Sequence, residues 1–286
     1  MSCFEKMRLL TIGFLLPLAL FSTAHAGCSQ AIEVPAAPAG RFVMTDEKTG
    51  EVSGVYPELL RSSSKETGCT FNFIIVPRAR FNQMLEQGTS HLFIPESQTP
   101  EKDKFGEFIP LFYSTPVIIS ARPDLAIRTI ADIKKHPALH VDVVRSYDWG
   151  SAYRQAIKEL KDLGMVTEVT DAGIIARKME AGRTDITIMS AHILYGNVIS
   201  LGLTDSLGKR LRYIRSPDFE AIPSGVYLSN SLPKQDRREL KNMLQNWLET
   251  RQLWRALQAN LPPDGLMSLT PLHKNHLPAS SKPRAY

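Results

Sequence analysis

Short strand-like runs alternate with helix-like segments along most of the chain, and this alternation constrains the fold most strongly. Residues 70–76 and 140–144 are apolar or β-branched runs typical of strands. Residues 151–163 instead place apolar side chains at helical spacing, and Gly164 follows as a helix-ending residue. Strands that alternate with helices predict an α/β architecture with a largely parallel sheet.

One unit of this pattern occurs twice. Residues 84–94 combine a helix end, Gly88 and a buried strand, and residues 179–189 repeat that order around Gly182. The two copies are about 95 residues apart, too far for a short-period repeat array. The repetition therefore suggests two similar lobes.

The first 26 residues predict a secretory signal peptide. Lys6 and Arg8 precede an apolar run over residues 9–21, and Ala24-His25-Ala26 has the small-x-small pattern of a cleavage site. The alternative is an N-terminal membrane anchor, but the run is shorter than the roughly 17–25 residues that a spanning helix needs. We expect a mature chain that begins at Gly27 and acts in the periplasm.

Two cysteines remain after such a cleavage, Cys28 and Cys69. In an exported chain this number suggests one disulfide between them. A competing interpretation is a bacterial lipobox ending at Cys28, which would make that residue a lipidated N-terminus. The expected aliphatic residue three positions before the cysteine is His25, which weakens that alternative.

Composition excludes some function classes. The hydrophobic content of 43% and charged content of 22% are those of a globular protein of one large domain or two lobes. The net charge of +5 comes without a basic stripe, since pairs such as Lys134-Lys135 and Arg237-Arg238 are isolated. We therefore expect no nucleic-acid partner.

The C-terminal part predicts helix and then disorder. Residues 234–260 read as a helical region broken into two, with apolar positions at helical spacing. After Pro262 the chain is rich in Pro, Ser, Lys and His. We expect residues 263–286 to form a poorly ordered tail.

Several spaced segments together resemble a known family. They are residues 50–60 (GEVSGVYPELL), 84–88 (MLEQG), 99–103 (TPEKD), 108–111 (FIPL) and 180–185 (EAGRTD). Their order and spacing resemble the bacterial extracellular solute-binding proteins of family 3, the periplasmic receptors of polar-amino-acid ABC importers. The similarity extends over residues 30–262.

The resemblance implies a two-lobed α/β fold of the type II periplasmic binding protein kind, with a ligand cleft between the lobes. Lobe 1 would contain residues 27–117 and a return segment, residues 222–262. Lobe 2 would contain residues 118–221. In such folds, ligands lie at strand carboxyl ends and helix N-termini.

The resemblance also implies which residues contact a ligand from lobe 1. In the amino-acid receptors an arginine holds the ligand carboxylate, and the matching residue is Lys102, a point charge rather than a fork. Arg78 and Arg80 are nearby cations that could compensate. The candidates on this lobe are Arg41, Phe42, Glu96, Ser97, Gln98, Thr99 and Lys102.

On lobe 2, Arg145, Ser146 and Tyr147 follow a strand and precede a helix, a geometry suited to an anion. The family usually has an aspartate where this chain has Ser190, so a standard α-amino acid is an uncertain ligand. Asp142 and Asp148 are substitutes for that aspartate.

These observations predict a monomeric, non-enzymatic receptor for a small polar, amino-acid-like or anionic solute, which delivers it to a membrane permease. We expect no cofactor and no metal, because the histidines lack metal-type spacing. Two alternatives stay open. One is an exported dehydratase-like enzyme of the same fold with Glu96 or Glu220 as its carboxylate, and the other is a receptor that reports to a membrane sensor.

Overall fold

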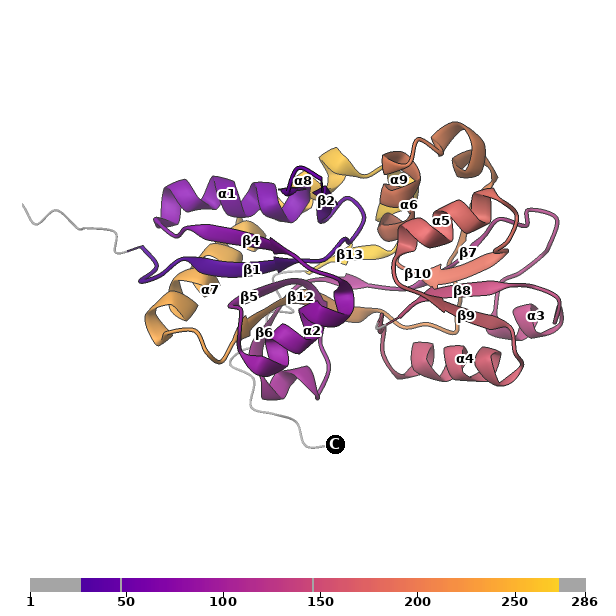
Figure 1. Ribbon diagram of the computed structural model, residues 1–286, viewed down its shortest axis with the longest axis horizontal. Helices are drawn as coiled ribbons and strands as arrows, with labels where there is room; N and C mark the ends of the chain where they lie inside the picture. The colour runs from indigo at the N-terminus through magenta and orange to yellow at the C-terminus, as the bar shows by residue number, and fades with distance from the viewer. Residues whose placement is uncertain (1–26, 47, 146, 273–286) are drawn as a thin grey trace, which may run out of the picture.

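Two separate groups of strands divide the described chain into two lobes that lie side by side (Figure 1). A computed structural model describes residues 27–46, 48–145 and 147–272. The predicted signal peptide and residues 273–286 lie outside the described residues. Each lobe has its own apolar core, as expected for units of this size.

Lobe 1 is built on parallel and antiparallel strand pairs. Strand β1 (Ile32–Ala36) pairs in parallel with β4 (Phe71–Ile75), and β2 (Met44–Asp46) forms a hairpin with β3 (Glu51–Ser53). A four-stranded antiparallel sheet has the order β13-β6-β12-β5. In that order, the strands are Leu269–Pro271, Gly106–Ser114, Ile222–Ser229 and Leu92–Ser97. The helices are α1 (Val55–Thr67), α2 (Arg78–Gln87), α7 (Lys234–Glu249) and α8 (Gln252–Asn260), with a 3₁₀ turn η1 at Lys102–Lys104.

Lobe 2 contains a five-stranded sheet in the order β11-β7-β10-β8-β9. These strands are Arg212–Ile214, Val117–Ser120, Ile186–Met189, Val141–Val144 and Val166–Val169. Its helices are α3 (Ile130–Lys134), α4 (Ser151–Asp162), α5 (Ala172–Glu180) and α6 (Ala191–Ser200), followed by a π-helical turn η2 at Thr204–Gly208.

The prediction of a largely parallel sheet is wrong in part. Among the described strands, β1–β4, β10–β8 and β8–β9 pair in parallel, whereas every pair that involves β6, β7, β11 or β12 is antiparallel. The antiparallel pairs arise because these four strands carry the chain from one lobe to the other and back. A strand that returns beside its outgoing partner must run in the opposite direction.

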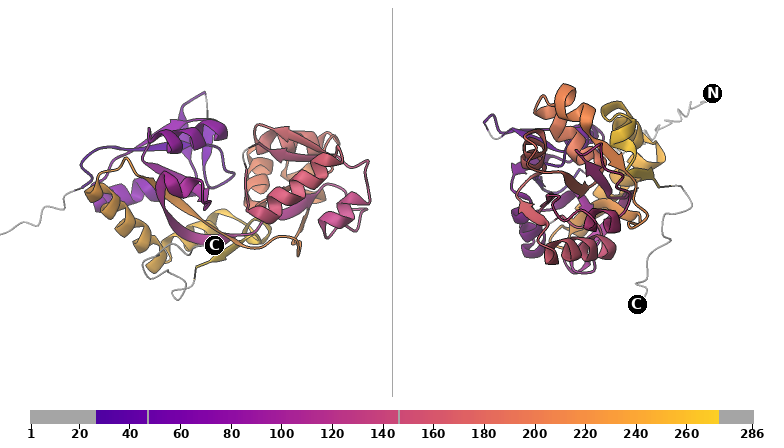
Figure 2. Two further views of the ribbon diagram at one scale, coloured as in Figure 1. Left: turned by 90° about the horizontal axis from the view of Figure 1, so that it is seen from below. Right: turned by 90° about the vertical axis from the view of Figure 1, so that its right-hand side faces the viewer.

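Three connections join the lobes along one side of the molecule (Figure 2). The chain leaves lobe 1 between β6 and β7, at residues 115–116, and returns between β11 and β12, at residues 215–221. A third connection follows α8, where α9 (Pro263–Leu266) packs against α6 of lobe 2 and β13 then pairs with β6 of lobe 1.

The predicted tail is therefore wrong for residues 263–272. The Pro and Ser content of this segment suggested disorder, but Leu269 is buried in the lobe 1 core and Met267 packs on the lobe 2 core. Those two apolar contacts and the β13–β6 ladder outweigh the weak local propensity.

The ends of several helices are set by individual residues. The helical region over residues 234–260 breaks at Arg251, which takes a left-handed conformation with φ 56°. Thr129 caps α3 in a capping box with Asp132. Gly68 ends α1 with φ 70°, a conformation that other residues adopt only with strain.

The N-terminal segment is fixed to lobe 1 by a covalent bond and by hydrogen bonds. Cys28 and Cys69 form a disulfide, as the sequence predicted. The backbone N–H of Ser29 donates to Asp236 Oδ1 over 2.7 Å, and its hydroxyl donates to Oδ2 over 2.8 Å. Among the described residues, no helix is both long and apolar enough to cross a membrane.

Candidate functional site

A cavity lies at the junction of the two lobes, with a volume of about 60 Å³. Strand β5 of lobe 1 and strands β8 and β10 of lobe 2 all end at this cavity, so the two copies of the helix–Gly–strand unit supply its opposite walls. Its lining residues are Ala39, Phe42, Arg78, Pro95, Glu96, Ser97, Lys102, Ser114, Tyr147, Asp148, Trp149, Ser190, His192, Ile193 and Ser224.

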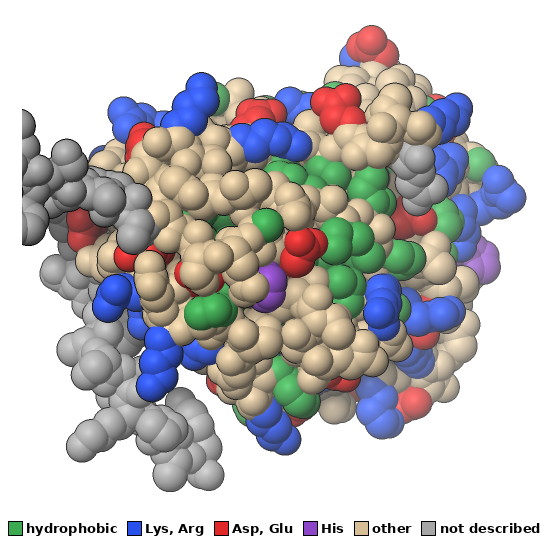
Figure 3. Space-filling view, turned by 60° about the vertical axis from the view of Figure 1, so that its left-hand side comes forward, with side chains coloured by type: hydrophobic (Ala, Val, Ile, Leu, Met, Phe, Trp, Pro, Cys, Tyr) green, Lys and Arg blue, Asp and Glu red, His purple; other side chains and the backbone are tan. Residues whose placement is uncertain are grey.

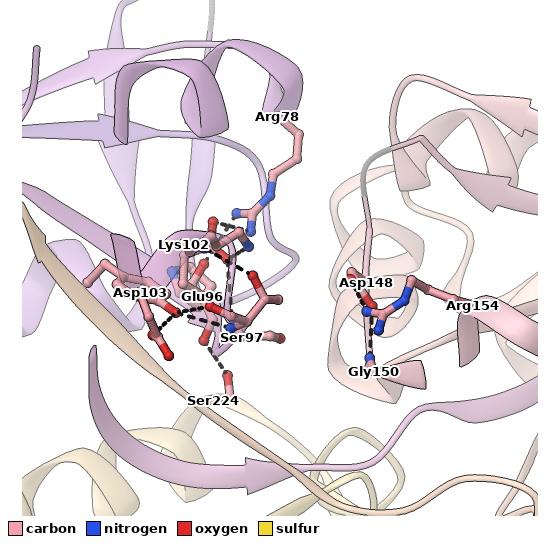
Figure 4. A network of polar contacts seen from close by, with 12 residues as sticks. Arg78, Glu96, Ser97, Lys102, Asp103, Asp148, Gly150, Arg154 and Ser224 are labelled. Carbon is pink, nitrogen blue, oxygen red and sulfur yellow. Dashed lines mark hydrogen bonds and ion pairs between the residues drawn. The ribbon is translucent and has the colours of Figure 1, made fainter. Parts of the chain in front are cut away.

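The lobe 1 wall is dominated by one buried carboxylate and two cations (Figure 4). The Glu96 side chain is 1% exposed; its Oε2 lies 2.5 Å from Lys102 Nζ and its Oε1 lies 2.9 Å from an Arg78 guanidinium nitrogen. The Arg78 guanidinium also donates to the Pro95 carbonyl and stacks over Phe81. This wall is thus a closed ion cluster rather than a pair of free cations.

Local structure holds this cluster in place. The Ser97 backbone N–H donates to Glu96 Oε2 over 3.1 Å, and the Ser224 hydroxyl donates to the Glu96 carbonyl. The Tyr227 hydroxyl donates to Asp103 Oδ1 over 2.7 Å, which anchors the η1 turn that begins at Lys102. The position of the Lys102 ammonium therefore depends on both β5 and β12.

The lobe 2 wall presents aromatic rings and a carboxylate. Figure 4 shows the carboxylate, Asp148, with its partners Gly150 and Arg154. Tyr147, Trp149 and Tyr153 form a ladder of edge-on contacts with centroid separations of 5.2 and 5.1 Å. Asp148 Oδ1 accepts from the Gly150 N–H, and Oδ2 pairs with Arg154 over 2.7 Å. Edge-on packing fixes the rings, so this wall offers flat apolar surface beside one polar group.

Between the walls, a chain of hydroxyl groups connects the lobes directly. Ser190 Oγ lies 3.1 Å from Ser114 Oγ on β6, 2.8 Å from Ser268 Oγ and 2.9 Å from His192 Nδ1. The Ala191 N–H donates to Ser268 Oγ over 3.0 Å. All four side chains in this cluster are buried, so their mutual hydrogen bonds offset the loss of water.

His192 also covers an aromatic ring of lobe 1. Its imidazole stacks on Phe42 with a centroid separation of 3.8 Å and an angle of 17° between the planes. Burial lowers the pKa of His192 from 6.5 to about 3, because the charged form loses its hydration. The ring is therefore neutral near pH 7 and packs as an aromatic side chain.

The backbones of the lobes approach closely beside this stack. A Cβ added at Gly196 on α6 would lie 2.5 Å from the Arg41 backbone nitrogen and 2.7 Å from Gly40. Gly40 itself faces the His192 carbonyl in the same way. Only residues without a side chain allow the loop after β1 to rest on α6.

The structure brings part of the predicted site together. Phe42, Glu96, Ser97, Lys102, Tyr147 and Ser190 line the cavity, as does Arg78, the cation considered as a substitute. Of the substitute carboxylates, Asp148 lines it, whereas Asp142 is buried elsewhere against Lys178 and Thr184. Whether these residues contact a ligand stays a prediction.

Other candidates lie away from the cavity. Arg41 directs its guanidinium toward Met44 and Asn260, and Gln98 donates to Asp103. The Thr99 N–H donates to the Tyr227 hydroxyl within the η1 region, and Arg145 is exposed. Ser146 lies outside the described residues.

Sequence reasoning missed the contribution of α6, which carries His192 and Ile193 into the cavity. This helix is apolar on all sides, so it shows no amphipathic period. The signal that was available is the largely apolar composition of residues 191–201 before Gly202. Trp149 and Ser224 gave no signal of their own, because each depends on a tertiary contact.

Two further observations limit the choice of site. Within residues 27–46, 48–145 and 147–272, no group of three or more His, Cys, Asp or Glu side chains is arranged to hold a metal ion. A larger hollow of about 290 Å³ lies on lobe 2 between α4 and strands β8 and β9. It is lined by lobe 2 alone, and its charged rim is already paired, as in Lys158–Asp162 and Lys161–Glu168.

Comparison with known proteins identifies the fold. No family model and no curated protein matches the sequence. Among solved structures, an ancestral arginine-binding protein bound to arginine is 18% identical with a TM-score of 0.64, covering 81% of this chain and 98% of that one. The arginine-, lysine-, histidine-binding protein ArtJ from Geobacillus stearothermophilus is 15% identical with a TM-score of 0.65, covering 81% and 95%.

A histidine kinase sensor domain with similarity to periplasmic binding proteins matches equally well. It is 15% identical with a TM-score of 0.64 and covers 81% of this chain and 96% of that domain. The chain thus has the two-lobed fold of periplasmic binding proteins, confirming the fold class implied by the sequence resemblance.

Proposed function

We propose that this protein is an exported solute-binding receptor that closes its two lobes around a small polar solute. The observation that carries the proposal is the cavity between the lobes, to which each lobe contributes residues at strand carboxyl ends. Ligands of open α/β folds bind in this location. The solved structures of the same fold that bind arginine support this proposal.

The disulfide supports a proposed location outside the cytoplasm. A Cys28–Cys69 disulfide is typical of an oxidising compartment such as the periplasm. Because the Cys28 sulfur is bonded to Cys69, it is not free to carry a lipid thioether. We therefore propose a soluble periplasmic form after cleavage at Gly27, rather than a lipid anchor.

We favour binding over catalysis. Glu96, one candidate for an enzymatic carboxylate, is held by two cations and is not a free base. Glu220, the other, is exposed and does not line the cavity. The buried Ser190–His192 pair belongs to the hydroxyl cluster, and no carboxylate of the described residues is among its hydrogen-bond partners.

The partner is proposed as a membrane permease, with a membrane sensor as the second candidate. The specific observation that favours the second is the equal likeness to a kinase sensor domain. A nucleic-acid partner is not proposed, since basic and acidic side chains are interspersed on the face in Figure 3. We propose a monomer as the binding unit, because one chain supplies both walls of the cavity.

The test is to purify the mature protein from the periplasm, denature it, and identify any released small molecule by mass spectrometry. The released solute is then titrated into refolded protein by calorimetry. We expect one unchanged solute per chain, and weaker binding in Asp148→Asn but not in Asp162→Asn, whose exposed carboxylate does not line the cavity. Conversion of the added solute, or equal affinity in both variants, would contradict the proposal.

A further inference from the structure

Glu96 lies at the point where a solute would meet the lobe 1 wall. Its carboxylate is 1% exposed, yet it lines the cavity together with both of its cationic partners, Arg78 and Lys102. Figure 4 shows the three side chains gathered on one wall, with Asp148 across the gap. The positive groups of this wall are thus already engaged by a carboxylate that belongs to the protein.

A second carboxylate has no favourable position beside this cluster. To reach Lys102 or Arg78, it would have to approach within a few ångströms of Glu96. Two carboxylates that share one site cannot both remain ionised without a large penalty. Displacement of Glu96 is also opposed, because the Ser97 N–H and two cations hold it in place.

One carboxylate oxygen of Glu96, Oε1, is buried at the cavity wall and lacks a hydrogen-bond donor among the described residues. The contact between Arg78 and Oε1 is an ion pair whose N–H groups are not directed at the oxygen, so Oε1 has no hydrogen-bond partner among the described residues. A buried acceptor without a partner carries a desolvation penalty that a donor from the solute would remove. The solute group that fits here is an uncharged N–H or O–H donor, since a cation would be repelled by Arg78 and Lys102.

We propose that Glu96 determines specificity by occupying the anion-binding position of lobe 1 with the protein's own carboxylate. The receptor then selects solutes that present an amide or hydroxyl group at this wall and rejects those that present a carboxylate. This inference rests on the proposed receptor function and adds the chemical class of the solute. In this respect the chain would differ from binding proteins in which a free cation holds the carboxylate of the ligand.

The experiment compares propionamide with propionate, two probes of nearly equal size that differ in charge. Binding is measured by NMR chemical-shift titration at constant ionic strength in the wild type, in Glu96→Gln and in Glu107→Gln. Glu107 is a half-exposed glutamate that pairs with Lys241 and does not line the cavity, so it is the matched control. Circular dichroism verifies that each variant is folded.

We expect the wild type and Glu107→Gln to bind propionamide at least tenfold more tightly than propionate. Glu96→Gln should reverse this preference, because Arg78 and Lys102 then face the cavity without a counter-charge. Because two unpaired cations destabilise that variant, a double variant, Glu96→Gln with Lys102→Met, restores the net charge of the wall. Arg78 is then a single cation without a counter-charge, so the preference for propionate should persist but be weaker than in Glu96→Gln.

The results separate this inference from the proposed function. A wild type that prefers propionate, or a Glu96→Gln variant whose preference is unchanged, overturns the role of Glu96. If that happens while a stoichiometric solute is released from the wild type, the receptor function stands. If neither probe binds any variant and no solute is released, both proposals fail.

Discussion

The Cys28–Cys69 disulfide should supply a large part of the stability of lobe 1. We consider the double variant Cys28→Ala/Cys69→Ala, which removes the bond without leaving a free thiol. The two residues are 41 positions apart in sequence. The loop-entropy relation gives about 4 kcal/mol of unfolding free energy for a loop of that length.

Native contacts do not change this expectation. The hydrogen bonds of Ser29 to Asp236 remain in the variant, so they cancel in the comparison. Cys69 is fully buried, and the two alanines that replace the cysteines remove only two sulfur atoms. The expected effect is therefore mainly the release of the unfolded chain from the loop constraint.

The assay is urea unfolding followed by circular dichroism, with and without a phosphine reductant. We expect the oxidised wild type to lose about 4 kcal/mol on reduction, and the double variant to unfold like the reduced wild type under both conditions. A loss below about 1 kcal/mol would refute the reasoning, because it lies outside the usual effect of a loop of this size. A response of the double variant to reductant would show that another process was measured.

Three other predictions concern the contact between the lobes. Gly196→Ala places a Cβ against the Arg41 and Gly40 backbones. Its free energy of unfolding, measured by thermal denaturation, should fall by roughly 1–3 kcal/mol, and its radius of gyration in X-ray scattering should increase. Ser200→Ala, on the exposed part of α6, should change neither quantity. Ser268→Ala removes a hydroxyl that hydrogen-bonds both Ser190 Oγ and the Ala191 N–H. The free energy of unfolding in urea should fall by about 1–3 kcal/mol. An effect no larger than that of the exposed control Ser206→Ala would contradict this prediction. The pKa of His192 is lowered from 6.5 to about 3 in the folded protein. As the pH falls, the imidazole is therefore protonated in the unfolded chain before it is protonated in the folded one. Protonation of the unfolded chain lowers the free energy of unfolding progressively from about pH 6.5 down to pH 3. We expect the wild type to lose about 2 kcal/mol more than His192→Asn between pH 7 and pH 5, and parallel stability curves for the two proteins would exclude a buried neutral imidazole.

Sequence patterns were sufficient for elements whose local signals are strong. The strand over residues 70–76 follows from its apolar and β-branched composition, and the amphipathic α4 follows from periodicity and from Gly164 at its end. The disulfide followed from cysteine count and export. The two copies of the helix–Gly–strand unit led to the two lobes, because each copy directs a strand end toward the same cavity.

Other features depend on contacts between distant residues and leave little trace in a local pattern. Helix α6 is apolar on every side because lobe 2, α9 and the loop after β1 all pack on it. The segment after Pro262 is ordered by a three-residue ladder with β6. The pairing of Glu96 with Lys102 joins the end of β5 to the η1 turn, and no sequence period indicates that the carboxylate points inward.

The direct contact between the lobes also affects how tightly any solute can bind. The hydroxyl chain through Ser190 and the stack of His192 on Phe42 hold the lobes together by groups of the protein itself. A solute that enters from the open form must compete with this closure. If closure without a solute is favoured by about 2.8 kcal/mol, about one molecule in a hundred is open and the apparent dissociation constant is about a hundredfold higher. A substitution that weakens closure of the empty form more than closure around the solute therefore raises affinity without any new contact to the solute.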